Sequence, residues 1–144
     1  MTARLLAIVR PGQETTALDG LPALVATARA EHARLRLACF RPLPPARVDR
    51  YDRVIADIDR EMDRIARSLV ERFTAATRAF DDVPVECVVR FGRPAREIRL
   101  ETEAFAATLV ACFERRRDPS VTIRLRGVLD SWRVARRNRR WVAT

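Results

Sequence analysis

The alternation of short apolar runs with longer segments of helical periodicity is the feature that most constrains the fold. Apolar, strand-like runs at 5–9, 35–40, 83–89 and 107–113 are separated by segments whose apolar residues recur every three or four positions. This alternation is typical of parallel strands joined by right-handed helical crossovers. The sequence therefore predicts an α/β fold: an open, doubly wound, mostly parallel five-stranded sheet with helices on both faces.

The longest predicted helix runs from about Arg47 to Phe80 and has one apolar stripe at spacings of three and four. This near-heptad spacing is compatible with a coiled coil. We favour a helix packed on the sheet, because strand-like runs flank it closely on both sides. Further helices are predicted at 15–31 and 94–105. After a loop at 114–120 we expect a short strand at 121–125, a helix at 128–138 and a last strand beginning at Trp141. Residues 1–144 are the size of one domain.

The net charge of +9 has an unusual composition, because all 28 basic residues are arginines. A chain rich in arginine, alanine and valine but free of lysine is expected from GC-biased coding, so part of the excess reflects codon usage. Arginine nevertheless binds phosphate well through its planar fork of donors. The charge is therefore weak evidence for a polyanion partner.

Several classes of function have no support in the sequence. The cysteines Cys39, Cys87 and Cys112 lack metal-ligand spacing, and the only histidine is His32. We therefore expect buried thiols in a reducing compartment, and neither a metal nor a cofactor. The acids at 57, 59, 61 and 63 alternate with arginines, which indicates a solvated helix face. No catalytic triad order, nucleophile elbow or phosphate loop is present, so we expect no enzyme. No run is long enough to span a membrane and no signal peptide is recognisable, which favours a cytoplasmic protein.

One turn resembles that of a known family. The strand Val85 to Val89 is followed by Gly92, Pro94 and Ile98 and then by a helix and an apolar strand. This pattern is similar to the universal stress protein family, as is the order of the predicted elements along nearly the whole chain. The resemblance implies a Rossmann-like fold, a role in the stress response and dimerisation through the last strand.

Two departures separate the chain from the family members that bind ATP. Those members usually end the first strand with an aspartate, where this chain has Arg10. They also have a glycine-rich phosphate loop after the fourth strand, whereas the loop 114–120 contains no glycine. Ser131 lies near the place of the loop's last serine, but Asp130 precedes it and would repel a phosphate. The chain therefore resembles the branch of the family that does not bind ATP, or a more degenerate relative of the family.

Arginines recur where the predicted strands end, and these ends converge on one rim of a doubly wound sheet. One interpretation is an anion-binding rim built from guanidinium groups. The other is that loops of a lysine-free basic protein must contain arginine. The candidate residues of the rim are Arg10, Arg41, Arg90, Gly92, Arg93 and Arg115, followed by Arg116 and Arg117, together with Ser131.

The C-terminal segment combines Trp141 and Val142 with several arginines, among them Arg136 and Arg137. An edge strand with an exposed tryptophan needs covering, so we predict that Trp141 and Val142 contribute to a homodimer. The alternative is a basic tail that binds nucleic acid by stacking and charge. The leading hypothesis is a non-catalytic universal-stress-type protein that acts through dimerisation or a protein partner without ATP. The alternatives are a nucleotide- or anion-binding regulator that uses the arginine rim and, less favoured, a nucleic-acid-binding protein.

Overall fold

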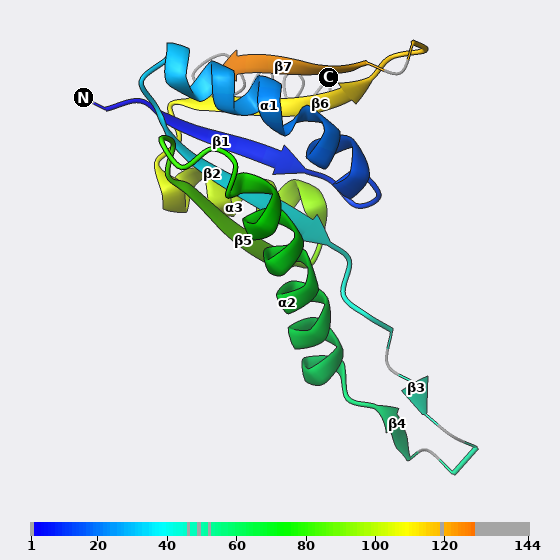
Figure 1. The fold of residues 1–144 in the computed structure, drawn as a ribbon. Helices are drawn as coiled ribbons and strands as arrows, with labels where there is room; N and C mark the ends of the chain where they lie inside the picture. The colour runs from blue at the N-terminus through cyan, green and yellow to red at the C-terminus, as the bar shows by residue number, and fades with distance from the viewer. Residues whose placement is uncertain (1, 46, 49, 52, 119, 129–144) are drawn as a thin grey trace.

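A five-stranded open sheet forms the centre of the computed structural model, which describes residues 2–45, 47–48, 50–51, 53–118 and 120–128 (Figure 1). The strand order is β5-β2-β1-β6-β7. Strands β1, β2, β5 and β6 are parallel to one another, and β7 is antiparallel to β6. The bounds are β1 (Arg4–Val9), β2 (Arg34–Arg41), β5 (Val85–Phe91), β6 (Leu109–Arg115) and β7 (Val121–Gly127).

The antiparallel β7 makes this a mixed sheet, which refines the prediction of a mostly parallel one. The chain between β6 and β7 spans only residues 116–120, which is too short for the helical crossover that a parallel strand requires. The short strand predicted at 121–125 is thus confirmed as the edge of the sheet. The helix predicted at 128–138 and the strand predicted from Trp141 lie outside the described residues.

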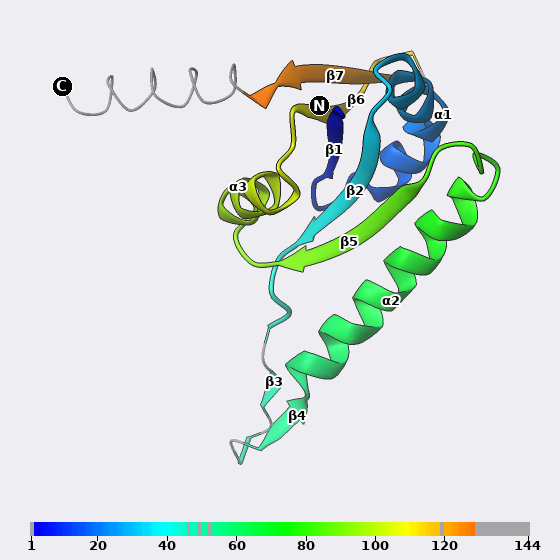
Figure 2. The ribbon, with the colours of Figure 1, turned by 90° about the vertical axis from the view of Figure 1, so that its left-hand side faces the viewer.

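Helices cover both faces of the sheet, as the sequence predicts (Figure 2). Helices α1 (Glu14–Ala30) and α2 (Ile58–Thr77) pack on one face, and α3 (Pro94–Phe105) packs on the other. Alternate residues of β1 divide the core, since Leu5, Ala7 and Val9 face α1 while Leu6 and Ile8 face the side of α3. Full burial on both faces explains why β1 is a continuous apolar run.

The long helix predicted from Arg47 to Phe80 is wrong in its first third. A two-stranded hairpin, β3 (Arg47–Val48) and β4 (Val54–Ala56), replaces that part. The helix begins after Asp57, whose carboxylate accepts hydrogen bonds from the backbone N–H groups of Asp59 and Arg60. An N-cap of this kind ends the extended hairpin and starts the helix, so the apolar stripe crosses a boundary that periodicity alone does not reveal.

The hairpin and the first half of α2 extend well past the end of the sheet (Figures 1 and 2). We call the described residues of 47–66 the arm. Only two residues of α2 are fully buried, Leu69 and Phe73, and both belong to its second half. None of the described helices is long and apolar enough to cross a membrane.

Candidate functional site

The place where a doubly wound fold binds its ligand lies between the carboxyl ends of β1 and β6, where the strand order reverses. Gln13 bridges these two ends. Its Oε1 accepts a hydrogen bond from the Arg10 N–H at 3.3 Å, and its Nε2 donates to the Phe113 carbonyl at 3.3 Å. The chain itself therefore links the two strands across which a ligand would lie.

The N-terminus of α1 opens at the same place and has no side-chain cap. Such a terminus attracts an anion. Glu14, in the first turn, supplies one: its carboxylate is only 12% exposed and pairs with Arg41 Nη1 at 2.7 Å. A carboxylate of the protein thus lies in the first turn of this helix, on the side of β2. The Nε of Arg41 is buried and has no hydrogen-bond partner among the described residues.

The predicted arginine rim does not form one cluster. Arg115 turns toward α1, where it pairs with Asp19 at 2.7 Å. Arg90 lies on the side of α3 and pairs with Glu97 and Glu101. With Arg41 held by Glu14, three of the rim arginines are neutralised by acids of the chain.

The other predicted rim residues have separate environments. Arg10 and Arg93 are exposed, as are Arg116 and Arg117, and no acid among the described residues pairs with them. Gly92 has a structural role: its φ of +142° disfavours any side chain, and its N–H donates to the Arg41 carbonyl at 3.0 Å. A Cβ at Gly92 would also lie 3.0 Å from Glu97. Ser131 lies outside the described residues.

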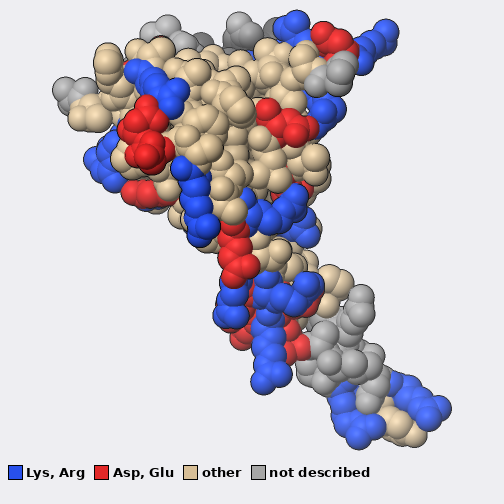
Figure 3. Space-filling view, in the orientation of Figure 1, with Lys and Arg blue, Asp and Glu red and all other residues tan. Residues whose placement is uncertain are grey.

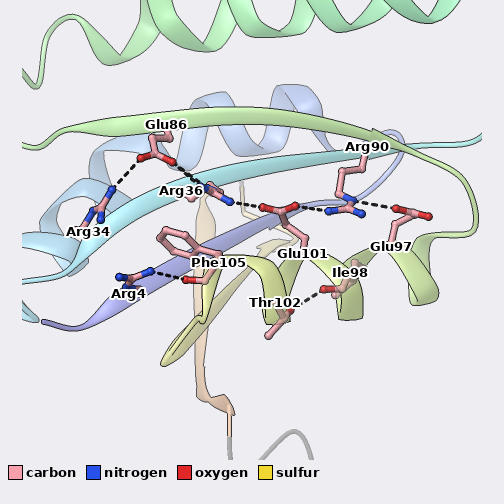
Figure 4. A network of polar contacts seen from close by, with 10 residues as sticks. All are labelled: Arg4, Arg34, Arg36, Glu86, Arg90, Glu97, Ile98, Glu101, Thr102 and Phe105. Carbon is pink, nitrogen blue, oxygen red and sulfur yellow. Dashed lines mark hydrogen bonds and ion pairs between the residues drawn. The ribbon is translucent and has the colours of Figure 1, made fainter. Parts of the chain in front are cut away.

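The most extensive polar cluster lies between the sheet and α3 (Figure 4). At its centre is Glu101, which is 3% exposed. Its carboxylate accepts from Arg36 Nη1 at 2.7 Å and from Arg90 Nη1 at 2.6 Å. Outside these, Arg36 also binds Glu86 at 2.8 Å, and Arg90 also binds Glu97 at 2.9 Å. Each charge in the network has an opposite partner, so the cluster joins α3 to β2 and β5.

Two further contacts complete this network. The guanidinium of Arg36 stacks over the ring of Phe105 at 4.5 Å, and Arg4 donates to the Phe105 carbonyl at 3.1 Å. The hydrogen bond from Arg36 holds the pKa of the Glu86 carboxyl below its ordinary value. Sequence analysis missed this cluster. A signal was available, because Glu101 stands between Ile98 and Phe105 at the spacing of the buried stripe of α3.

Cys39 is buried in the core, as the sequence predicts. Cys87 and Cys112 are only half-buried. A hydrogen bond with Cys87, together with burial, raises the pKa of the Cys39 thiol. A protonated, buried thiol is a poor nucleophile. The described residues contain no group of three or more His, Cys, Asp or Glu side chains that could hold a metal ion.

The arm and the segment leading to it expose apolar and aromatic surface. Tyr51, at the tip of the hairpin, is 65% exposed and Leu43 is 59% exposed. The guanidinium groups of Arg50 and Arg53 lie 5.3 and 5.2 Å from the centre of the Tyr51 ring. Figure 3 shows charged side chains of both signs along α2 and basic ones at the tip.

The sequence matches no known protein-family model and no curated protein. The resemblance to universal stress proteins therefore stays a prediction that depends on the residues quoted for it.

Proposed function

We propose that this chain is a non-catalytic protein of the universal stress type, which acts in the cytoplasm by binding a protein chain and not by binding ATP. The strand order supports a relationship to that family, since β1 lies at the centre and β1, β2, β5 and β6 are parallel. The antiparallel β7 differs from the mostly parallel sheet that the resemblance to this family predicts.

The observation that supports the absence of ATP most directly is the bridge made by Gln13 between β1 and β6. A nucleotide in that crevice would have to break both hydrogen bonds. Phosphates at the N-terminus of α1 would also be disfavoured by the negative charge of Glu14 in its first turn. The acid and the bridging amide therefore make the usual ligand site unfavourable for a polyphosphate.

Two surfaces are candidates for protein binding. The arm extends past the sheet with exposed aromatic surface at its tip. The predicted interface residues Trp141 and Val142 remain a second proposal, because they lie outside the described residues. A homodimer through either surface would be consistent with the proposed function.

A second candidate is a small-anion regulator, and the buried, unpartnered Nε of Arg41 favours it. This donor lies beside the open N-terminus of α1, where an anion is stabilised. Against it, Glu14 already neutralises Arg41, so an added anion would have to displace that carboxylate. Titration with inorganic phosphate tests this candidate separately from ATP.

The test of the proposed function is calorimetry with Mg-ATP in physiological salt. We expect no saturable binding, and only weak heats that inorganic triphosphate reproduces and salt removes, as for nonspecific attraction to arginine. One-to-one binding in the low micromolar range that depends on magnesium would contradict the proposal. Binding of phosphate alone, saturable and lost in Arg41→Ala, would favour the anion regulator.

A further inference from the structure

The described helices cover the two faces of the sheet unequally. Helix α1 packs on one side of β6 and β7, whereas α3, on the other side, lies over β1, β2 and β5 (Figure 2). Neighbouring strands are about 4.8 Å apart and packed helices about 8–10 Å apart, so one helix covers about two strands. Two helices are therefore needed to cover five strands. The side of α1 and α2 has them, while the side of α3 has one among the described residues.

The side of β6 and β7 opposite α1 is the part left uncovered, and we call it the open face. Val110 and Cys112 of β6 point to this side, where they border the core cluster beneath α3, and both are only half-buried. The alternate residues of the same strand, Ala111 and Phe113, face α1 and are fully buried. Strand β6 is therefore sealed on one side and partly open on the other.

The chain leaves the described fold beside the open face. Val128, the last described residue, follows β7 directly, is helical, and packs against the core cluster beneath α3. Its N–H donates to the Thr108 carbonyl at 3.2 Å, which holds it at the start of β6. Residues 129–144 therefore continue from one end of the open face, on the side of the sheet that lacks a second helix.

The sequence from Val128 to Asn138 predicts a helix with one apolar face. Val128, Trp132 and Ala135 are spaced by four and three, so they lie on the same side of such a helix. The charged residues on its opposite side are Asp130, Arg133 and Arg137. Eleven helical residues are about 16 Å long, which fits within the length of the seven-residue strand β6.

We propose that this C-terminal segment folds back as a helix over residues 128–138 and covers the open face of its own chain, beside α3. The helix starts at Val128 and runs along β6, with its apolar face on the sheet. Trp132, about 6 Å along the helix, is then level with Val110, about 7 Å along the strand from Thr108. Ala135, about 10 Å along the helix, comes near Cys112, about 13 Å along the strand.

The charges of the open face are compatible with this occupant. Arg126 is opposite Val110 in the register of β6 and β7, so both side chains point to the same side. The proposed helix brings the indole of Trp132 level with Arg126, and a guanidinium is attracted to an indole face. The other arginine of this face, Arg124, already pairs with Glu114 at 3.1 Å.

Attachment favours the chain's own segment over a separate protein. The segment begins at the face without a linker, so its effective concentration there is high, whereas a second molecule would first lose its free translation and rotation. The inference goes beyond the proposed function and does not depend on it. Trp141 and Val142 lie past the proposed helix, so their predicted role in a homodimer is a separate question.

Alkylation of Cys112 in the full chain, followed site by site with mass spectrometry, tests the contact. Trp132→Glu places a charge on the apolar face of the proposed helix, and its matched control, Val134→Glu, places the same charge on the opposite side. We expect Trp132→Glu to speed the alkylation of Cys112 at least about tenfold, because the segment no longer has to open first. Val134→Glu should leave the rate unchanged. Cys87, half-buried on the other side of the sheet, is the internal control.

Tryptophan fluorescence distinguishes the chain's own segment from that of a second copy. Trp132 and Trp141 are the only tryptophans, so Trp141→Phe makes Trp132 the single emitter. We expect its emission to be blue-shifted from that of the urea-unfolded chain and shielded from acrylamide, equally at all protein concentrations. Shielding that is lost on dilution would assign the face to a second copy and overturn the proposal. An exposed Trp132, an unchanged Cys112 rate in Trp132→Glu, or equal rates in both Glu variants would also overturn it.

Discussion

Replacement of Glu101 by glutamine should destabilise the protein more than any other single loss of an acid in the polar network. The carboxylate is 3% exposed and accepts hydrogen bonds from two guanidinium groups. The amide of Glu101→Gln has nearly the same shape, but it can accept from only one arginine and turns its NH₂ group toward the other. The variant therefore loses one charge-assisted hydrogen bond and leaves a donor facing a donor.

The expected cost is about 2–3 kcal/mol, since a buried hydrogen bond to a charged group contributes about 1.5–3 kcal/mol. It stays below the cost of an isolated buried charge because Arg36 and Arg90 are partly exposed and keep Glu86 and Glu97 as second partners. Urea unfolding measures this loss of unfolding free energy. With a slope of about 2 kcal/mol/M, the midpoint should fall by about 1 M or slightly more.

The matched control is Glu86→Gln, which removes the exposed acid of the same network. Its side chain is 46% exposed, so the loss should be about 1 kcal/mol or less. The reasoning is refuted if the two variants lose equal stability. It is also refuted if Glu101→Gln unfolds at the wild-type midpoint, because the buried pair would then contribute nothing.

Two further predictions concern packing and pH. Gly20→Ala should destabilise the protein by about 1–2 kcal/mol in urea unfolding despite the better helix propensity of alanine, because its Cβ would lie 2.8 Å from the buried ring of Phe113; an unchanged or higher midpoint would contradict this. The unfolding free energy should fall as the pH drops below the ordinary glutamate pKa of 4.5, since Glu86 has a lowered pKa when folded and stabilises the fold only while ionised. Glu86→Gln should show a shallower decline over the same pH range, and identical profiles would contradict that assignment.

The elements that sequence reasoning predicted best are those whose pattern depends on burial or on the backbone preference of a single residue. Strand β1 is apolar on both faces because both faces are covered, and α1 has one buried stripe. Pro94 at the start of α3 has a fixed φ that suits the first helical turn, so its boundary was predictable as well. In each case a local property of the residues decides the structure.

The boundary at Asp57 was not predictable from periodicity. Val48 and Ile55 continue the apolar stripe of α2 at helical spacing, yet they belong to β3 and β4. Asp57 can cap the helix, or the helix can continue past it. Which of the two occurs depends on the packing around the residues that precede Asp57. The direction of β7 depends similarly on the length of the preceding turn.

The arginine rim shows why strand-end positions alone do not define a site. Sequence order placed these residues at one edge, but the partner of each guanidinium is set by tertiary packing. Arg41 meets Glu14 across 27 positions, and Arg115 meets Asp19 across 96. Such distant pairs leave no signal in a single sequence. Glu101 was different, since a charge within an apolar stripe is visible in the sequence itself.

The distribution of paired and uncovered surface favours the arm over the sheet end as the place of binding. A ligand at the carboxyl ends of β1 and β6 would have to break the Gln13 bridge and disturb the pair between Glu14 and Arg41, so part of its binding free energy would be lost. A protein that covers the half-buried face of Ile58 and Met62 would break none of the hydrogen bonds or ion pairs described above. The gain from burial would then be opposed by the entropic cost of association but not by the loss of interactions within the chain.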